Sequence, residues 1–469
     1  MTAGPDDHRR VVPADRPGRR TKGAGPGERG SMFRSLRVRN YRYFAMGQIV
    51  SNTGTWMQRV AQDWLVLGLT HNSGTALGIV SALQFAPTLL FSLWGGVIAD
   101  RCDKRKLLLI TQTATGIASL VLGLLIVSHQ VHVWHVYLLA LALGVITSID
   151  NPSRQAFVVE MVGRDDVPNA VSLNSATFNL SRIVGPAVAG VLISVIGEGP
   201  LFLVNAVSCI GALVALVMMR TSELQTIALL PRAAGQLRAA LRYVRERRDL
   251  MLPMALLFVV ATLGLNFQVT AALMAKGTFH SDARSYGLLT TMLAVGSLTG
   301  ALVSTRRLRR PRLRMLIGSA LAFGVIESAC SVMPTYASFA IMLIPMGVAT
   351  IVFTTACNAA VQMGTSLEMR GRVMSLYLLC FMGGGPVGSL LIGWLAQVIS
   401  PRASIAMGGI ASIGGAIVLS LLLARREGVR VETTRFGAIP RLHLAVPEGS
   451  SLVRATAGSP MTLRRRAAG

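Results

Sequence analysis

Charged residues are scarce in this chain of 469 residues, and they make up only 14% of it. A soluble protein carries about 25% charged residues because its surface faces water. Apolar residues make up 52% and the mean hydropathy is +0.54, so the chain is also too apolar to be mainly disordered. The composition therefore excludes an ordinary soluble protein.

Cysteines and catalytic sequence patterns are few as well. The five cysteines are scattered without a CxxC pair, which predicts neither a disulfide nor a metal site. His129, His132 and His135 recur at every third position, but no carboxylate lies near them in the sequence, and we expect them to be solvated. Walker, HExxH and GxSxG patterns are missing. We therefore expect no enzyme activity, no cofactor and no ATP hydrolysis on this chain.

Most of the chain consists of apolar stretches long enough to cross a bilayer, about 20 residues each. We count twelve, at residues 43–69, 75–98, 107–128, 133–153, 168–195, 200–219, 251–275, 284–304, 315–333, 336–360, 371–398 and 403–424. This pattern predicts an all-α integral membrane protein with twelve transmembrane helices in two six-helix halves, residues 41–220 and 251–424.

Positive charge is concentrated in the two tails and in alternate loops. Residues 1–40 and 425–469 each carry a net charge of +6, and we expect both to be mobile basic tails. If the N-terminus is cytoplasmic, the inner loops hold twenty Lys and Arg, against Lys276, Arg284 and Arg402 outside. By the positive-inside rule both termini are then cytoplasmic. The charge of +25 thus reflects topology and contact with the lipid bilayer, and we expect no nucleic-acid partner.

The two predicted halves are joined by a basic linker at residues 221–250. Leu237, Leu241 and Val244 are interleaved with arginines there, which predicts an amphipathic helix along the inner membrane surface. A Gly-Pro pair recurs at residues 185–186 and 385–386, in the fifth span of each half. This recurrence indicates an internal duplication, the usual construction of secondary transporters.

Three sets of residues resemble motifs of the major facilitator superfamily. Residues 96–106, with Gly96, Asp100 and Arg101, resemble its signature between the second and third helices, although Asp103 stands at the second glycine position. Residues 181–190 are similar to the fifth-helix motif of its proton-driven drug exporters, with Ala189 in place of one glycine; the matching positions are Arg182, Gly185, Pro186 and Gly190. Residues 33–42, 51–58 and 150–157 are similar to the transmembrane secretion effector branch, which includes the enterobactin exporter.

This resemblance covers residues from about 32 to about 425 and implies a function. It implies a monomer in a bacterial-type plasma membrane that exports a small organic molecule, such as a siderophore, an antibiotic or another drug-like compound. The proton gradient would drive this multidrug-type antiport by alternating access. Two alternatives stay open: an uptake permease of the same fold, and a membrane sensor or scaffold without transport of its own.

Polar residues recur at intervals of three or four on one face of the first span, at Gln48, Asn52, Thr55, Arg59 and Gln62 or Asp63. A polar stripe facing lipid would leave unpaired donors and acceptors, so it must face protein or water. The resemblance implies that the first, fourth, seventh and tenth spans line a central cavity. The seventh then offers Asn266 and Gln268, and the tenth offers Asn358 and Gln362. The alternative for all of these is hydrogen bonding between helices without substrate contact.

Two groups of charged residues in or near the spans are candidates for proton coupling and for gating. Arg59 and Asp63 are four residues apart and can pair; Asp63 is either a proton carrier or half of a fixed ion pair. Near the predicted inner side the charged residues are Asp100, Arg101, Lys104, Arg105, Asp150 and Arg154. The resemblance implies that Asp100 points at the N-terminus of the eleventh span, near Gly371, where the helix dipole favours an anion, and that Lys104 or Arg105 then reaches Asp150. Such a network would latch the halves together on the inner side; the alternative is that these charges only set the topology.

Overall fold

The computed structural model describes residues 33–163, 166–225, 236–305, 313–426, 430–436 and 439–445. Residues 1–32, which make up most of the predicted N-terminal tail, and the loop arginines at 306–312 lie outside this part. The helices are η1 (Arg34–Arg37), α1 (Arg39–Leu69), α2 (Gly74–Arg101), α3 (Lys104–Val127), α4 (Val133–Val162), α5 (Val167–Ile196), α6 (Gly199–Val217), η2 (Thr221–Glu223), α7 (Gln236–Glu246), α8 (Arg248–Leu263), α9 (Phe267–Leu273), the π-helical turn η3 (Met274–Thr278), α10 (Ala283–Thr305), α11 (Leu313–Ser331), α12 (Tyr336–Gly364), α13 (Leu367–Val398) and α14 (Pro401–Arg426).

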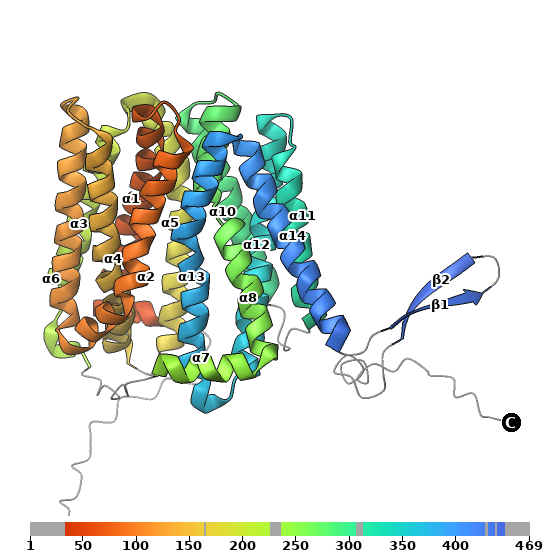
Figure 1. Ribbon diagram of the computed structural model, residues 1–469. Helices are drawn as coiled ribbons and strands as arrows, with labels where there is room; N and C mark the ends of the chain where they lie inside the picture. Colours follow the sequence, from red (N-terminus) through yellow and green to blue (C-terminus); the bar gives the residue numbers. More distant parts are fainter. Residues whose placement is uncertain are drawn as a thin grey trace, which may run out of the picture.

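Twelve spans can be followed in this helix order, six before α7 and six after it (Figure 1). Among the described residues, ten helical segments are long and apolar enough to cross a membrane. In α11 the apolar stretch, Met315–Ser331, is shorter, and α1 is long enough but carries the polar stripe. The predicted all-α membrane fold is confirmed.

The seventh span is broken rather than continuous, unlike the single stretch at 251–275 that the hydropathy predicts. Helix α8 ends at Leu263, and α9 begins at Phe267. The Asn266 side chain donates a hydrogen bond of 2.7 Å to the carbonyl oxygen of Thr262. A side chain therefore satisfies one of the carbonyls that the break would leave unpaired in a membrane.

Each half packs its fifth span against its first, which is the relationship expected of an internal duplication. In the first half, a Cβ on Gly185 of α5 would meet Trp56 and Thr53 of α1. In the second half, a Cβ on Gly384 of α13 would meet Thr262 of α8, whereas Gly385 has open space. The close approach thus uses the Gly-Pro glycine in one half and its neighbour in the other.

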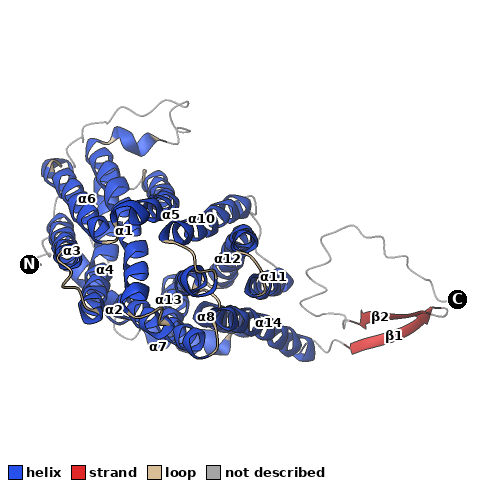
Figure 2. Cartoon of the chain, turned by 90° about the horizontal axis from the view of Figure 1, so that it is seen from above, coloured by secondary structure: helices blue, strands red, loops and turns tan. Residues whose placement is uncertain are grey.

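The halves meet along two pairs of helices, α2 with α13 and α5 with α10 (Figure 2). We call the end of the bundle that carries α7 the linker end, and the opposite end the far end (Figure 1). At the far end, a Cβ on Gly74 would meet the backbone of Gly393, and one on Gly287 would meet the backbone of Pro186. Glycines therefore let the two halves approach closely there.

Two of the predicted tail segments contain regular structure. The Ser35 amide and hydroxyl donate hydrogen bonds of 3.0 and 2.8 Å to the Asn169 side chain, so residues 34–40 are attached to the bundle. Beyond α14, β1 (Arg430–Phe436) and β2 (Ile439–Ala445) pair as an antiparallel hairpin. These segments of the predicted tails therefore carry regular structure; β1 contains Val431 and Thr433, whose branched side chains favour strands.

Candidate functional site

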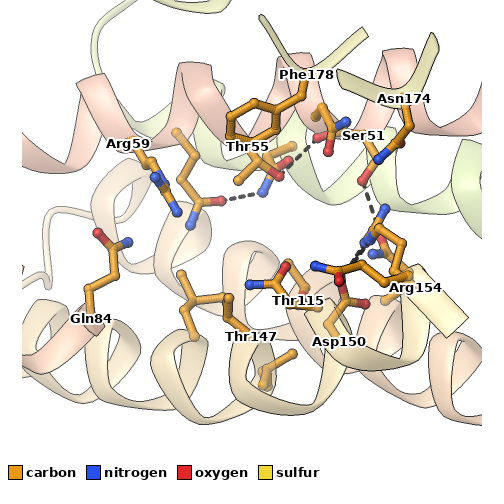
Figure 3. Close-up of a pocket in the computed structure, with 18 of the residues that line it drawn as sticks. Ser51, Thr55, Arg59, Gln84, Thr115, Thr147, Asp150, Arg154, Asn174 and Phe178 are labelled. Carbon is orange, nitrogen blue, oxygen red and sulfur yellow. Dashed lines mark hydrogen bonds and ion pairs between the residues drawn. The ribbon is translucent and has the colours of Figure 1, made fainter. Parts of the chain in front are cut away.

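A cavity of about 430 Å³ lies within the first half (Figure 3). Its lining comes from all six helices α1 to α6. Ten of the lining residues are amides: Asn52, Gln58, Gln62, Gln84, Gln112, Asn151, Gln155, Asn174, Asn179 and Asn205. The lining also includes the charged residues Arg59, Asp150 and Arg154. A volume of about 300–1,000 Å³ is usual for sites that hold small molecules.

The first-span stripe contributes part of this lining. Four stripe residues line the cavity, Asn52, Thr55, Arg59 and Gln62, together with Ser51 and Gln58 of the same helix. Gln48 does not line it; it is buried, and its Oε1 has no hydrogen-bond partner among the described residues. The helical spacing therefore places most of the stripe on water-accessible space inside the protein.

Arg59 and Asp63 have separate partners, so the predicted ion pair between them is wrong. The Arg59 guanidinium lies 4.9 Å from the centre of the Trp56 ring and 5.9 Å from that of Phe85. Asp63 Oδ2 instead accepts a hydrogen bond of 2.7 Å from Tyr286 Oη, on α10 of the second half. The i,i+4 spacing makes a pair possible, but aromatic rings on α1 and α2 hold the guanidinium away from Asp63.

A buried polar network supports the cavity wall between α1, α3 and α6. Ser119 Oγ donates a hydrogen bond of 2.6 Å to Gln58 Oε1. The Asn205 amide nitrogen donates to the same oxygen and to Ser119 Oγ, and Ser51 Oγ donates to Gln112 Oε1 over 3.2 Å. Our sequence interpretation missed these residues; the signal was an isolated Asn or Gln within apolar spans three and six.

The charges at the linker end contact other residues than the predicted latch requires. Asp150 pairs with Arg154 one turn along α4 and accepts a hydrogen bond of 2.7 Å from Thr111. Lys104 Nζ lies 3.0 Å from Glu160 Oε1, and Arg105 donates to the carbonyl oxygens of Leu216 and Val217 at the end of α6. Each of these side chains therefore has a partner other than the expected one, and the expected bond from Lys104 or Arg105 to Asp150 is wrong.

The remainder of the signature segment forms the end of α2 and the short turn that leads to α3. Gly96 is buried, Asp100 is half-buried and Arg101 is exposed. Asp103 caps α3, since its side chain accepts a hydrogen bond of 3.1 Å from the Lys106 amide. Aspartate is a preferred N-cap residue, which explains how the chain turns here without the second glycine of the signature.

The fifth-helix motif is a packing surface. Pro186 lies within α5, and Gly185 faces α1 as described above. A Cβ on Gly190 would meet the backbone of Ala283 and Arg284 on α10. Arg182 is half-buried and does not line the cavity. The motif thus brings α5 close to both its own half and the other half.

The second-half candidates do not line this cavity. Asn266 bonds the backbone at the break between α8 and α9, Gln268 and Asn358 are half-buried, and Gln362 is exposed. Glu327 of α11 is buried, and its Oε2 has no hydrogen-bond partner among the described residues. The described part of the chain contains no group of three His, Cys, Asp or Glu side chains that could hold a metal.

Comparison with known proteins assigns the chain to a family. The profile of the transmembrane secretion effector family matches residues 30–456. The staphyloferrin A transporter of Staphylococcus aureus is 26% identical over 404 residues, which cover 84% of this chain and 99% of that protein. The enterobactin exporter of Citrobacter koseri is 25% identical, over 88% of this chain and 96% of that protein.

Solved structures show the same fold. A bacterial homologue of the human lysosomal transporter Spinster matches with a TM-score of 0.63 at 15% identity, over 82% of this chain and 95% of that chain. The nucleoside transporter NupG matches with a TM-score of 0.65 at 12% identity, over 82% of this chain and 99% of that chain. This chain therefore belongs to the transmembrane secretion effector family of the major facilitator superfamily, and it is a multi-pass membrane transporter rather than an enzyme.

Proposed function

We propose that this protein exports a small organic molecule of the siderophore class across a bacterial plasma membrane, driven by the proton gradient. The observation that carries the proposal is the amide-rich cavity inside a bundle of apolar helices. Polar groups at membrane depth are costly unless they pair or line a water-filled space, and such residues mark transport pathways. The two named relatives transport staphyloferrin A and enterobactin, which supports a siderophore-like substrate.

The distribution of Lys and Arg among the loops supports an orientation in which the linker end faces the cytoplasm. By the positive-inside rule, the side with twenty Lys and Arg in its loops is the inner side. The inter-half contacts described above at Gly74, Gly287 and Tyr286 lie at the far end. In this orientation they close the outer side, as expected for the state that receives substrate from the cytoplasm. Alternating access then requires these far-end contacts to break.

Proton coupling is assigned to Asp63 in this proposal. Its carboxylate accepts a hydrogen bond from Tyr286 across the two halves, and a hydrogen bond to an ionised acceptor is about twice as strong as one between neutral groups. Protonation of Asp63 therefore weakens a contact that closes the far end. A proton bound there changes the balance between the two states, which is what coupling requires.

Everted membrane vesicles provide the test. We expect staphyloferrin A or enterobactin to cause proton release from acidified vesicles that contain the protein, measured with a pH-sensitive dye. Asp63→Asn removes the charge with little change of shape, so it should abolish proton release and retain substrate binding. Active export by this variant would exclude Asp63 as the proton carrier.

The same vesicles separate export from the alternatives. Transport in the opposite direction would indicate an uptake permease. If neither compound moves in either direction and protons are not released, the proposal of siderophore export is wrong. Size-exclusion chromatography of the purified protein with multi-angle light scattering should give the mass of a monomer.

A further inference from the structure

The cavity lining has more positive than negative charge. It contains two arginines and one aspartate, and Asp150 pairs with Arg154, which leaves Arg59 as the excess charge. Among the described residues, no carboxylate lies within 4.0 Å of the Arg59 guanidinium. A charge removed from bulk water is costly unless it is paired or hydrogen-bonded, so the cavity at Arg59 favours an anion.

Aromatic rings hold the Arg59 guanidinium in place. Trp56 lies one turn before Arg59 on α1, and Phe85 reaches it from α2. The Trp56 ring in turn packs edge-on against Phe178, with centroids 5.8 Å apart, and Phe178 lines the cavity. Stacking of this kind uses the faces of the guanidinium and leaves its N–H groups at the edge for hydrogen bonds.

The cavity lining near Arg59 also includes amide side chains. Figure 3 shows Arg59 and Gln84 at one end of it, with Asp150 and Arg154 at the other. Gln62, one turn beyond Gln58 on α1, also lines the cavity, and its buried Oε1 has no partner among the described residues. Beside the cation there is thus an unused acceptor, suited to a hydroxyl or N–H donor on the same ligand.

We propose that Arg59 binds a carboxylate group of an organic anion through its guanidinium edge, with Gln62 accepting a hydrogen bond from a donor group beside it. The proposal rests on the cavity being the substrate site of the exporter proposed above. A planar guanidinium presents paired N–H donors that match the two oxygens of a carboxylate, which a lysine ammonium cannot do. An organic cation is disfavoured at this subsite because it would meet the positive charge of Arg59, which no carboxylate of the described residues pairs within 4.0 Å.

Binding to the purified, full-length protein tests the subsite directly. The probe is citrate, a hydroxyl-bearing tricarboxylate, and the reference is its neutral trimethyl ester, which has the same carbon skeleton. We expect calorimetry to detect citrate binding at least about tenfold tighter than binding of the ester. Tenfold corresponds to about 1.4 kcal/mol. Arg59→Gln should remove this preference. Arg59→Lys should retain only part of it, because lysine keeps the charge but lacks the paired N–H donors of the guanidinium.

Arg402→Gln is the matched control. Arg402 also lies over an aromatic ring, 5.7 Å from the centre of Phe279, but it does not line the cavity. This variant should bind citrate as the wild type does. Wild-type protein without preference for citrate over the ester, or an Arg59→Gln variant that keeps the preference, would overturn the proposal.

The two proposals can fail separately. If Arg59→Gln binds citrate normally while wild-type vesicles export a siderophore, the subsite is wrong and the exporter function stands. If citrate binding depends on Arg59 but wild-type vesicles transport neither siderophore, the anion subsite stands and the proposed substrate class is wrong. If Arg59→Gln is poorly folded, Arg59→Lys still decides, since unchanged citrate affinity in that variant would contradict bidentate binding.

Discussion

Tyr286 donates a hydrogen bond of 2.7 Å to Asp63, and this bond joins the two halves of the transporter at the far end. The Tyr286 ring also stacks on Trp64, with centroids 6.1 Å apart and an angle of 17° between the planes. Gly287 follows directly, and the backbone of Pro186 lies against it. A polar bond, an aromatic stack and a glycine contact thus act on the same junction between α1, α5 and α10.

Tyr286→Phe should shift the protein toward the state that is open at the far end. The change removes one hydrogen bond to a charged group, worth about 1.5–3 kcal/mol, so the balance between states should move about tenfold or more. A single cysteine introduced at Ala283, which is 4% exposed, should react faster with an impermeant maleimide applied from the far side.

Tyr336→Phe is the control for this experiment. The Tyr336 hydroxyl donates a hydrogen bond of 3.0 Å to the carbonyl oxygen of Ser285, and both residues belong to the second half. Its loss should leave the reactivity at position 283 unchanged. Equal reactivity in wild type and Tyr286→Phe would show that the Asp63 bond does not hold the far end closed.

Asp150→Asn should destabilise the first half, because it leaves Arg154 without its ion-pair partner. Removal of one member of a fully buried ion pair costs about 3–5 kcal/mol. This pair is partly buried and lines the cavity, so the cost should be smaller, and the apparent unfolding temperature in detergent should fall accordingly. Asp150→Asn combined with Arg154→Gln should recover most of the loss. If Asp150→Asn unfolds at the wild-type temperature but makes cysteines introduced at the linker end more reactive, Asp150 takes part in a latch.

Deletion of residues 1–31 should leave membrane insertion and transport intact, because this segment has no apolar periodicity. Deletion of residues 1–37 should reduce stability. It removes the bonds from Ser35 to Asn169 and the contact of 2.8 Å between Arg34 and Asp166, for about 1–3 kcal/mol in total. Comparing the unfolding temperatures and yields of the two deletions checks this; equal stability would show that the attachment is dispensable.

Asp282 should make a pH-dependent contribution to the start of α10. The Ser285 amide and hydroxyl donate hydrogen bonds of 2.9 and 2.8 Å to Asp282 Oδ1, and these bonds hold the pKa of Asp282 below its ordinary value of 3.8. Because the folded pKa is lowered, this stabilisation is complete above the unfolded value and disappears as the pH falls through the folded one.

Two variants of Asp282 test this pH dependence. Asp282→Ala should cost about 0.5–2 kcal/mol at neutral pH, with a smaller difference from wild type below about pH 4. Asp282→Asn keeps an acceptor oxygen, so it should retain most of the cap without the pH dependence. Unfolding temperatures of the three proteins measured at pH 7 and pH 3 test this, and a pH-independent loss in Asp282→Ala would contradict it.

Much of the architecture follows from the sequence alone. Membrane spans can be predicted because each needs a long apolar run, whatever its neighbours are. The polar face of α1 is equally local, since residues three and four apart lie on one side of a helix; Asn52, Arg59 and Gln62 therefore line the cavity as a group. The break at Gly264 to Asn266 cannot be predicted from hydropathy, because an apolar segment has the same hydropathy whether or not it is helical.

The partners of the charged residues were decided by the tertiary structure. Spacing along α1 allows Arg59 to pair with Asp63, but Trp56 and Phe85 hold the guanidinium and Tyr286 takes the carboxylate. Tyr286 lies 223 positions from Asp63 in the sequence, and only the close packing of α5 against α10 brings it near. Local periodicity determines which face of a helix is polar, whereas the helix that meets that face depends on how both halves pack.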